Sequence, residues 1–292
     1  MTRNPLDLRP TLLDDGLNIR SRGYFLRAIP RDEPRLNGSP EASRWFELQD
    51  RLAQLRNGDF SANRALLRCA RESNDWSLKT VALHILGDTG TEECFRELRA
   101  EIEALRNLGT INVEARELIL LACRAFAAWG RLDVVPVLMD QYLTLRIKGT
   151  PEIALLPLLM ADLLSDDENT MLAHEPPEEH LEDYLNLVMS EYEALVGSLG
   201  SDKVLVFRGA PQSVRGLAER MRRLTTRYVS VELVALRRRF EPATGLDCSE
   251  IFADDTVHPL AAAAIAEEFL DSDAAARFED GVRYFFGRRI PE

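Results

Sequence analysis

The residues best suited to chemistry lie in one stretch, Ser165 to Glu193, which holds ten carboxylates, two histidines and no lysine or arginine. Carboxylate and imidazole groups are ligands for divalent metal ions, so metal binding is the first chemistry to consider. His174 and His180 could act with Glu178 or Glu179. Their spacing around two prolines matches no known metal-ligand motif, and exposed loop histidines explain them equally well. The sequence therefore predicts no metal site here.

Motifs for covalent catalysis and for phosphate binding are also missing from the sequence. It has no G-x-S-x-G, no P-loop, no G-x-G-x-x-G and no H-E-x-x-H. His258 follows Asp254 and Asp255 and precedes Pro259, and a turn that enters a helix explains this group without catalysis. The sequence predicts a protein that is not an enzyme and that uses no cofactor.

Charge is distributed unevenly along the chain. From Gly149 to Asp202 there are 13 acidic residues and no basic one, whereas from Lys203 to Arg239 ten basic residues oppose two acidic ones. The two segments could neutralise each other, the acids could stay exposed and bind a basic partner, or the acids could form a disordered loop. The apolar residues of 181–199 recur at helical spacing, which argues against disorder.

Of the remaining two interpretations we favour a binding surface, because a dense field of one sign weakens folding unless a partner offsets it. The partner expected from this field is a basic protein. The residues predicted to contact it are Asp166, Asp167, Glu168, Glu175, Glu178, Glu179, Glu182 and Asp183.

Helix signals are dense in the rest of the chain. The helix starts expected from capping residues and first-turn prolines lie at Ser39–Pro40, Thr91, Thr150–Pro151 and Pro259. Segment 213–240 predicts two more helices, and 203–207 is the one candidate strand. The aromatic residues near the C-terminus are expected in the core, where they would hold the chain end in place. The fold class predicted is all-α.

Two neighbouring segments repeat each other at a spacing of 40 residues. When 76–98 is shifted onto 116–138, Val81 falls on Leu121, Ala82 on Ala122, Leu86 on Phe126, and Gly90 on Gly130. Each segment predicts a helix that ends at a left-handed glycine and is followed by a second helix. Such a helix pair cannot bury its apolar faces alone, so pairs must stack.

The pattern Ala-x-x-x-Leu, a glycine four residues later and a second helix resembles a HEAT-like or armadillo-like α-helical repeat. The resemblance covers about residues 60–145 and implies stacked antiparallel helix pairs that bind proteins. We expect one helical domain over 1–292. Its parts are an irregular segment (1–39), HEAT-like pairs (40–165), an acidic loop and helix (166–202) and an arginine-rich helical part with an aromatic tail (203–292).

Composition sets the remaining expectations. The 292 residues carry a net charge of −12, which makes nucleic acid an unlikely ligand. Neither a secretory signal nor a membrane span is evident, so we expect a soluble cytoplasmic protein. Scattered Cys69, Cys94, Cys123 and Cys248 indicate buried thiols in a reducing compartment. All but three of the 36 basic residues are arginine, which indicates a GC-rich genome, as many bacteria have.

Together these features predict a bacterial immunity protein that neutralises a toxin domain by covering its basic active site with an acidic surface. One alternative is a HEAT-like scaffold for an endogenous partner. Another, from a different class, is an enzyme that acts on nucleic acid through the arginine-rich C-terminal part, whose clusters could hold phosphate.

Overall fold

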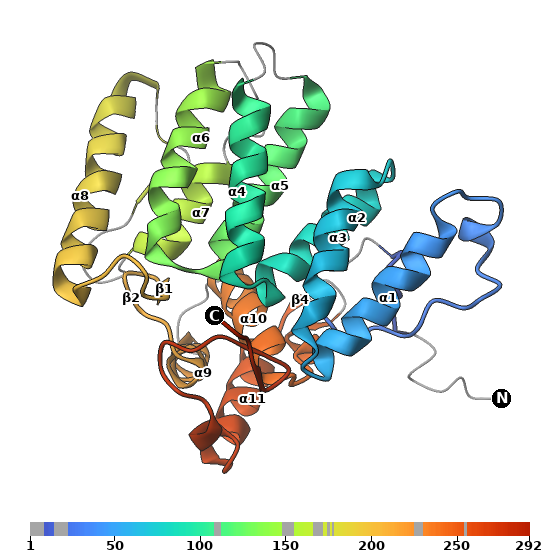
Figure 1. Cartoon of the computed structure of the whole chain (residues 1–292). Coiled ribbons are helices and arrows are strands. Elements are labelled where there is room, and N and C mark those ends of the chain that lie inside the picture. The colour runs from blue at the N-terminus through green and yellow to red at the C-terminus, as the bar shows by residue number, and fades with distance from the viewer. Residues whose placement is uncertain are drawn as a thin grey trace. The chain divides into compact units, whose positions relative to one another are not determined.

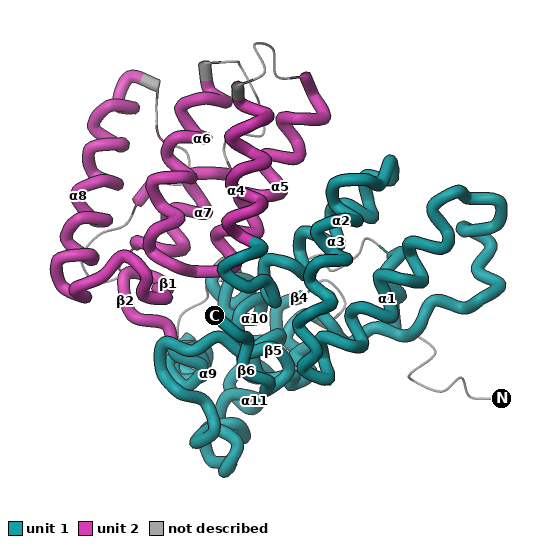
Figure 2. The backbone as a smooth tube through the Cα atoms, viewed as in Figure 1, with its two compact units in different colours: residues 1–94, 213–292 teal, residues 95–212 magenta. Residues whose placement is uncertain are grey.

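The computed structural model describes residues 9–14, 23–107, 112–147, 155–165, 172–173, 176, 178–224, 230–253 and 256–292. Over these residues the prediction of an all-α protein is confirmed, with eleven α-helices and three short antiparallel β-hairpins (Figure 1). The chain divides into two compact units, Met1–Cys94 with Ser213–Glu292 (unit 1) and Phe95–Gln212 (unit 2) (Figure 2). The predicted acidic surface lies in unit 2.

Unit 1 combines both ends of the chain. Its α-helices are α1 (Ala42–Arg56), α2 (Asn63–Glu72), α3 (Trp76–Thr89), α9 (Val214–Arg223), α10 (Ser230–Thr244) and α11 (Pro259–Asp271). Its hairpins are β3–β4 (Phe252–Ala253, Thr256–Val257) and β5–β6 (Tyr284–Phe285, Arg288–Arg289), with the short helices η2 (Pro34–Leu36), η3 (Phe60–Ala62), η8 (Ser249–Ile251) and η9 (Ala275–Arg277). Helix α3 packs on α2, and α9 packs on α10 and α11.

Unit 2 is continuous in sequence. It contains α4 (Glu92–Asn107), whose first turn belongs to unit 1, α5 (Val113–Trp129), η4 (Leu132–Val134), α6 (Val135–Ile147), α7 (Leu155–Leu164), η6 (Glu178–His180), α8 (Leu181–Leu199) and the hairpin β1–β2 (Val206–Phe207, Ala210–Pro211). Helix α7 is its centre and packs against α5, α6 and α8. The strand expected at 203–207 is therefore one half of a hairpin.

Side-chain capping explains several helix starts. Asp75 accepts the backbone N–H of Leu78 at 3.2 Å at the start of α3, and Asn112 accepts that of Ala115 at 2.8 Å at the start of α5. Helices α4 and α11 begin where the sequence predicts, at Glu92 after Thr91 and at Pro259. Helix α1 begins at Ala42, two residues later than expected. Thr150 and Pro151 lie outside the described residues.

The predicted 40-residue repeat corresponds to α3 and α5. The three matched pairs, Val81 and Leu121, Ala82 and Ala122, and Leu86 and Phe126, are all buried. Gly130 takes the expected left-handed conformation (φ 80°). The same expectation is wrong for Gly90, whose φ of −60° and ψ of 143° are extended, so the chain passes directly into α4. The packed helix pairs are compatible with a helical repeat.

A second repeat relates elements of unit 2 to elements of unit 1 that lie 78 to 80 residues further along the chain. It is evident from the β-hairpins. The turn of β1–β2 donates the N–H groups of Arg208 and Gly209 to the carbonyls of Asp162 and Leu163, at 3.0 and 2.9 Å. These carbonyls end helix α7 and have no partner within the helix. The hairpin therefore caps the C-terminus of that helix.

Hairpin β5–β6 repeats this cap in unit 1. Phe286 and Gly287 donate their N–H groups to the carbonyls of Pro242 and Ala243 at the end of α10, at 2.7 and 2.9 Å. Both hairpin turns have positive φ at two successive residues, 51° and 68° in unit 2 and 49° and 69° in unit 1. Such turns match the twist of two-residue hairpins. We call each hairpin with its capped helix, α7 or α10, a hairpin cap.

The equivalence extends to the helix that precedes each hairpin. The buried residues Tyr184 and Val188 of α8 lie 78 positions before Ala262 and Ala266, which are buried in α11. The hydrogen bond from Gln212 N to Leu205 O recurs 78 residues later, from Ile290 N to Arg283 O. Each unit thus contains a capped helix, a second helix and a hairpin in the same order along the chain.

Candidate partner-binding surface

Helix α8 carries the candidate surface, and its ends are well defined. The carboxylates of Glu182 and Asp183 lie in its first turn, where they interact favourably with the helix dipole. At the other end Gly200 is left-handed (φ 74°) and donates its N–H to Val196 O at 2.9 Å. These local signals fix α8 as the helix that the apolar periodicity predicts.

Packing covers little of α8. Only Tyr184 and Val188 of its 19 residues are buried, whereas ten of the 17 residues of α5 are buried. Leu187 exposes 40 % of its surface. The apolar residues that remain half-buried are Leu181, Leu185, Met189, Tyr192, Leu195, Val196 and Leu199. A helix covered this lightly keeps apolar surface that another molecule could bury.

Three of the eight predicted contact residues come together at the N-terminal end of α8. Glu179 belongs to η6 and Glu182 and Asp183 to the first turn of α8, and all three side chains are exposed. The Asp183 carboxylate lies 3.7 Å from Nδ1 of His180. Glu193, which the prediction omitted, is exposed three turns further along the same face.

The other five predicted residues cannot be placed to the same extent. Asp166, Asp167, Glu168 and Glu175 lie outside the described residues, and of Glu178 only the backbone, in η6, is described. Their participation stays a prediction. The α8 surface is therefore defined by Glu179, Glu182, Asp183, Leu187 and Glu193.

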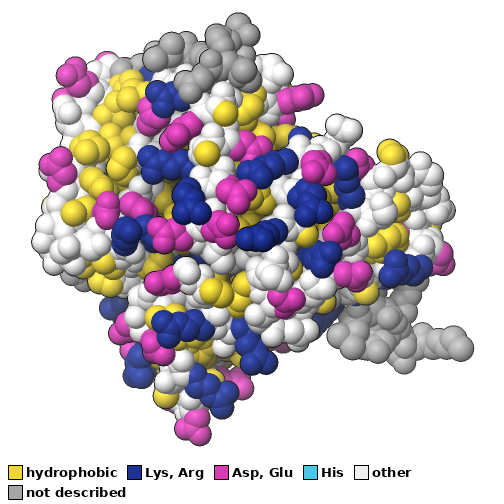
Figure 3. Space-filling view, in the orientation of Figure 1, with side chains coloured by type: hydrophobic (Ala, Val, Ile, Leu, Met, Phe, Trp, Pro, Cys, Tyr) yellow, Lys and Arg dark blue, Asp and Glu magenta, His cyan; other side chains and the backbone are white. Residues whose placement is uncertain are grey.

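Acidic and apolar side chains are mixed on this surface. Figure 3 shows both kinds together in the region where Figure 1 places α8. Carboxylates at the end of a helix attract basic groups over several ångströms, and nearby apolar surface stabilises the contact once it forms. The arrangement suits a protein partner with basic and apolar residues better than it suits a small molecule.

Metal ligands are not clustered in the described part of the chain, where no group of three or more His, Cys, Asp or Glu side chains could hold a metal ion. His174 lies outside the described residues. His258 is exposed at the start of α11 and donates its backbone N–H to Ile251 O at 2.8 Å, a bond between the two residues that flank hairpin β3–β4. Asp254 and Asp255 lie outside the described residues, so the helix-entry turn predicted from the three residues stays a prediction.

Two arginines of the arginine-rich segment pair with the acids of that segment. Arg215 pairs with Glu219 at 3.1 Å and Arg220 with Glu232 at 2.6 Å. The acidic and basic segments also contact each other, because Arg208, which is 7 % exposed, pairs with Asp162 at 3.2 Å. Pairing between the two segments therefore neutralises Asp162. Among the described residues it involves none of the three exposed acids at the end of α8.

Sequence reasoning missed a buried polar cluster in unit 1. The hydroxyl of Tyr24 donates to Asp88 Oδ2 at 2.5 Å, and Nε2 of His84 lies 3.7 Å from the same oxygen. Burial raises the pKa of Asp88 to about 6, although Arg238 acts in the opposite direction. The backbone N–H of Tyr24 donates to Glu241, and its carbonyl accepts from Arg56. Tyr24 thus ties the N-terminal segment to three helices.

Glu241 forms the second half of this cluster. It pairs with Arg237 at 3.1 Å, and the two side chains are 1 % and 2 % exposed. It also accepts the backbone N–H of Cys248 at 3.3 Å. Burial raises the pKa of Glu241, against the lowering effect of Arg237. The spacing of four residues between Arg237 and Glu241 is a local helical pattern, but the contact of Glu241 with Tyr24 spans 217 residues, and no local pattern marks it.

The cysteines occupy structural positions. Cys94, Cys123 and Cys248 are buried and Cys69 is half-buried, and all four are free thiols. Burial raises the pKa of the Cys69 thiol to about 11 and raises those of Cys123 and Cys248 further. A thiol with a raised pKa is a poor nucleophile at neutral pH.

Comparison with protein-family models, with curated proteins and with solved structures finds no match to this chain. Among the described helices, none combines the length and the apolar character that crossing a membrane requires. The function must therefore be argued from the α8 surface itself.

Proposed function

We propose that this protein is a non-catalytic protein-binding protein and that the α8 surface binds a basic partner. The observation that carries the proposal is how little of α8 is covered. Only two of its 19 residues are buried, and exposed acids lie beside exposed Leu187. Burying a leucine side chain contributes about 1.5–3 kcal/mol, so a partner that covers this face would gain affinity.

In its most specific form, the proposal is that the partner is a toxin domain and the protein its immunity protein. Toxins that act on nucleic acids or nucleotides have basic active sites, and carboxylates can occupy such sites in place of the anionic substrate. The helical-repeat resemblance of the sequence and the net charge of −12 support this form. A HEAT-like scaffold for an endogenous partner is the alternative on the same surface.

The test uses the protein encoded by the gene beside that of this chain, produced separately with its toxic activity disabled. Association is measured at several salt concentrations with the wild type and with Glu182→Lys, Asp183→Lys. The matched control is Glu267→Lys, Asp271→Lys, which makes the same change of charge at exposed positions of α11, the equivalent helix of unit 1. Thermal denaturation verifies that each variant is folded.

We expect the α8 variant to associate at least about tenfold more slowly at low salt, with the difference shrinking as salt rises, and the α11 variant to behave as wild type. Equal rates for all three proteins would refute the α8 surface. A neighbouring protein that binds but lacks toxicity would favour the scaffold. Salt-insensitive weak binding to nucleic acid would remove the third alternative, an enzyme that acts on nucleic acid.

A further inference from the structure

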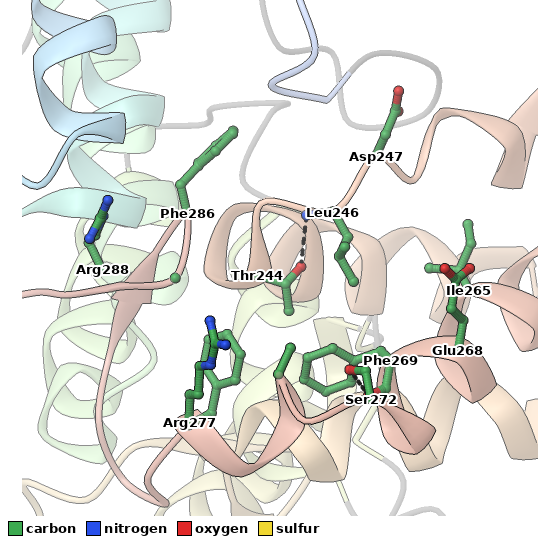
Figure 4. Close-up of a pocket in the computed structure, with 13 residues that line it drawn as sticks. Thr244, Leu246, Asp247, Ile265, Glu268, Phe269, Ser272, Arg277, Phe286 and Arg288 are labelled. Atoms are coloured by element: carbon green, nitrogen blue, oxygen red, sulfur yellow. Dashed lines mark hydrogen bonds between the residues drawn. The ribbon is translucent and has the colours of Figure 1, made fainter.

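A pocket of about 610 Å³ opens in unit 1 between the end of α10, helix α11, η9 and hairpin β5–β6 (Figure 4). Small-molecule sites commonly measure about 300–1,000 Å³. Its apolar lining comes from Leu246, Ile265, Phe269, Phe278 and Phe286. Leu246 is 38 % exposed, which is unusual for a leucine in a concave site and leaves apolar surface for a ligand.

The pocket exists because the two repeated halves of the fold differ in helix length. Helix α8 has 19 residues and α11 has 13. At the repeat spacing of 78, the last six residues of α8, 194–199, correspond to 272–277. In unit 1 these six residues leave the helix and the last three form η9, so that Ser272, Ala274 and Arg277 line the pocket.

The walls of the pocket are held in place by contacts within unit 1. Ser272 Oγ donates to Phe269 O at 2.7 Å, and Leu246 N donates to Thr244 Oγ1 at 3.1 Å, as the dashed lines of Figure 4 show. The ring of Phe286 lies 4.8 Å from the guanidinium of Arg56. A ligand would therefore meet a site that is largely formed in advance, which lowers the entropic cost of binding.

Positive charge gathers at one side of the pocket. Arg277 and Arg288 come from the same side in Figure 4, whereas Glu268 lies on the opposite side beside Ile265. Both arginine side chains are exposed, and neither forms an ion pair with another described residue. The other carboxylate that lines the pocket, that of Asp247, pairs with Arg9 at 2.7 Å.

We propose that this pocket binds an amphipathic anion, a small molecule with a planar apolar body and one acidic group. The body would lie against the phenylalanine rings and Leu246, and the acidic group would accept hydrogen bonds from Arg277 and Arg288. Two guanidinium groups suit this role because each presents several donors in a fixed plane. The site uses no residue of the α8 surface, so it is independent of the proposed partner binding.

The test titrates the full-length protein with 8-anilino-1-naphthalenesulfonate, a fluorescent aromatic anion. The variant Arg277→Gln, Arg288→Gln removes both charges at exposed positions. Arg289→Gln is the matched control, since Arg289 is the next residue on the same strand and its side chain points to the other face of the hairpin. The uncharged analogue N-phenyl-1-naphthylamine separates the contribution of the acidic group from that of the rings.

We expect saturable binding of one probe molecule, at least about tenfold weaker in the double variant and unchanged in Arg289→Gln. The uncharged analogue should bind the wild type at least about tenfold more weakly than the sulfonate does. The proposal is overturned if the double variant binds the sulfonate as wild type does, if Arg289→Gln weakens binding equally, or if no saturable binding occurs.

Discussion

The buried carboxylate of Asp88 should make the stability of unit 1 depend on pH in a direction opposite to that of a typical salt-bridged acid. Its side chain is 7 % exposed and is faced by Tyr24, His84 and the guanidinium groups of Arg238 and Arg283. Burial is the largest influence and raises its pKa from 3.8 to about 6. The folded state therefore holds a proton on Asp88 over a pH range in which the unfolded state has lost it.

The sign and the magnitude follow from this difference. Between about pH 4 and pH 6 the folded state binds more protons than the unfolded state, so the free energy of unfolding falls as pH rises. Folding raises the pKa of Asp88 from 3.8 to about 6, and each pKa unit is equivalent to about 1.4 kcal/mol. The free energy of unfolding therefore falls by roughly 3 kcal/mol at most. Above about pH 6 Asp88 is ionised in both the folded and the unfolded state, so it no longer makes the free energy of unfolding depend on pH.

The perturbation is Asp88→Asn, which keeps an oxygen that can accept the hydrogen bond of Tyr24 but cannot ionise. The free energy of unfolding is measured by urea denaturation from pH 4 to pH 8 for the wild type, for Asp88→Asn and for Asp273→Asn, an exposed control in the same unit. Titrating groups that do not interact with Asp88 cancel in the difference between wild type and variant, whereas His84, 3.7 Å from Asp88, contributes to it.

We expect the wild type to lose about 1–3 kcal/mol relative to Asp88→Asn between pH 4 and pH 7, and no comparable loss relative to Asp273→Asn. A difference between wild type and Asp88→Asn that is constant over this range would refute the reasoning. A difference of the opposite sign would mean that Arg238 and Arg283 outweigh burial.

Four further predictions test the packing of the chain. A Cβ at Gly23 would lie 1.5 Å from Glu241 Oε1, so Gly23→Ala should lower the free energy of unfolding by about 2 kcal/mol or more. A Cβ at Gly197 in α8 would meet no atom within 4 Å, so Gly197→Ala should raise the free energy of unfolding by about 0.5–1 kcal/mol. Thermal denaturation should therefore shift in opposite directions for the two glycine variants. Phe285 is fully buried in hairpin β5–β6, and Phe285→Ala should cost about 3–5 kcal/mol by the same assay. The thiol of Cys69, with a pKa of about 11, should react with 5,5′-dithiobis(2-nitrobenzoic acid) at pH 7.5 far more slowly in the native protein than in urea; fast native reaction would contradict its burial.

The features that the sequence predicts well are local. Helices α4 and α11 begin where a capping threonine and a first-turn proline indicate, and the buried and half-buried apolar residues of α8 follow the spacing of three and four residues. Each signal lies within one or two helical turns, so a single sequence contains all of it. The sequence also reveals the 40-residue repeat of α3 and α5, because both helices carry a small residue at the position where the two segments match.

The hairpin caps escape prediction because their signal is short and widely spaced. Phe207 and Gly209 match Phe285 and Gly287 at a spacing of 78, but two residues cannot distinguish a repeat from chance. What makes the two hairpins equivalent is their hydrogen bonding to the ends of α7 and α10, which depends on tertiary contacts. The Tyr24 cluster escapes for the same reason, since Tyr24 and Glu241 lie 217 positions apart.

The repeat also explains why α8 and α11 should serve different purposes. In α11 the third buried position is Phe269, which anchors the helix against Phe240 and Phe278, whereas the residue 78 positions earlier is the acidic Glu191. The unit 1 helix thus has an aromatic anchor, and its shorter length opens the pocket beside that anchor. The unit 2 helix lacks an aromatic residue at this position, has Tyr184 against Tyr142 as its aromatic contact, and keeps the rest of its apolar stripe half-covered. Because ordering each residue costs about 1–2 kcal/mol in backbone entropy, a long helix with two buried side chains has little stabilisation to spare and gains most from a partner that covers it.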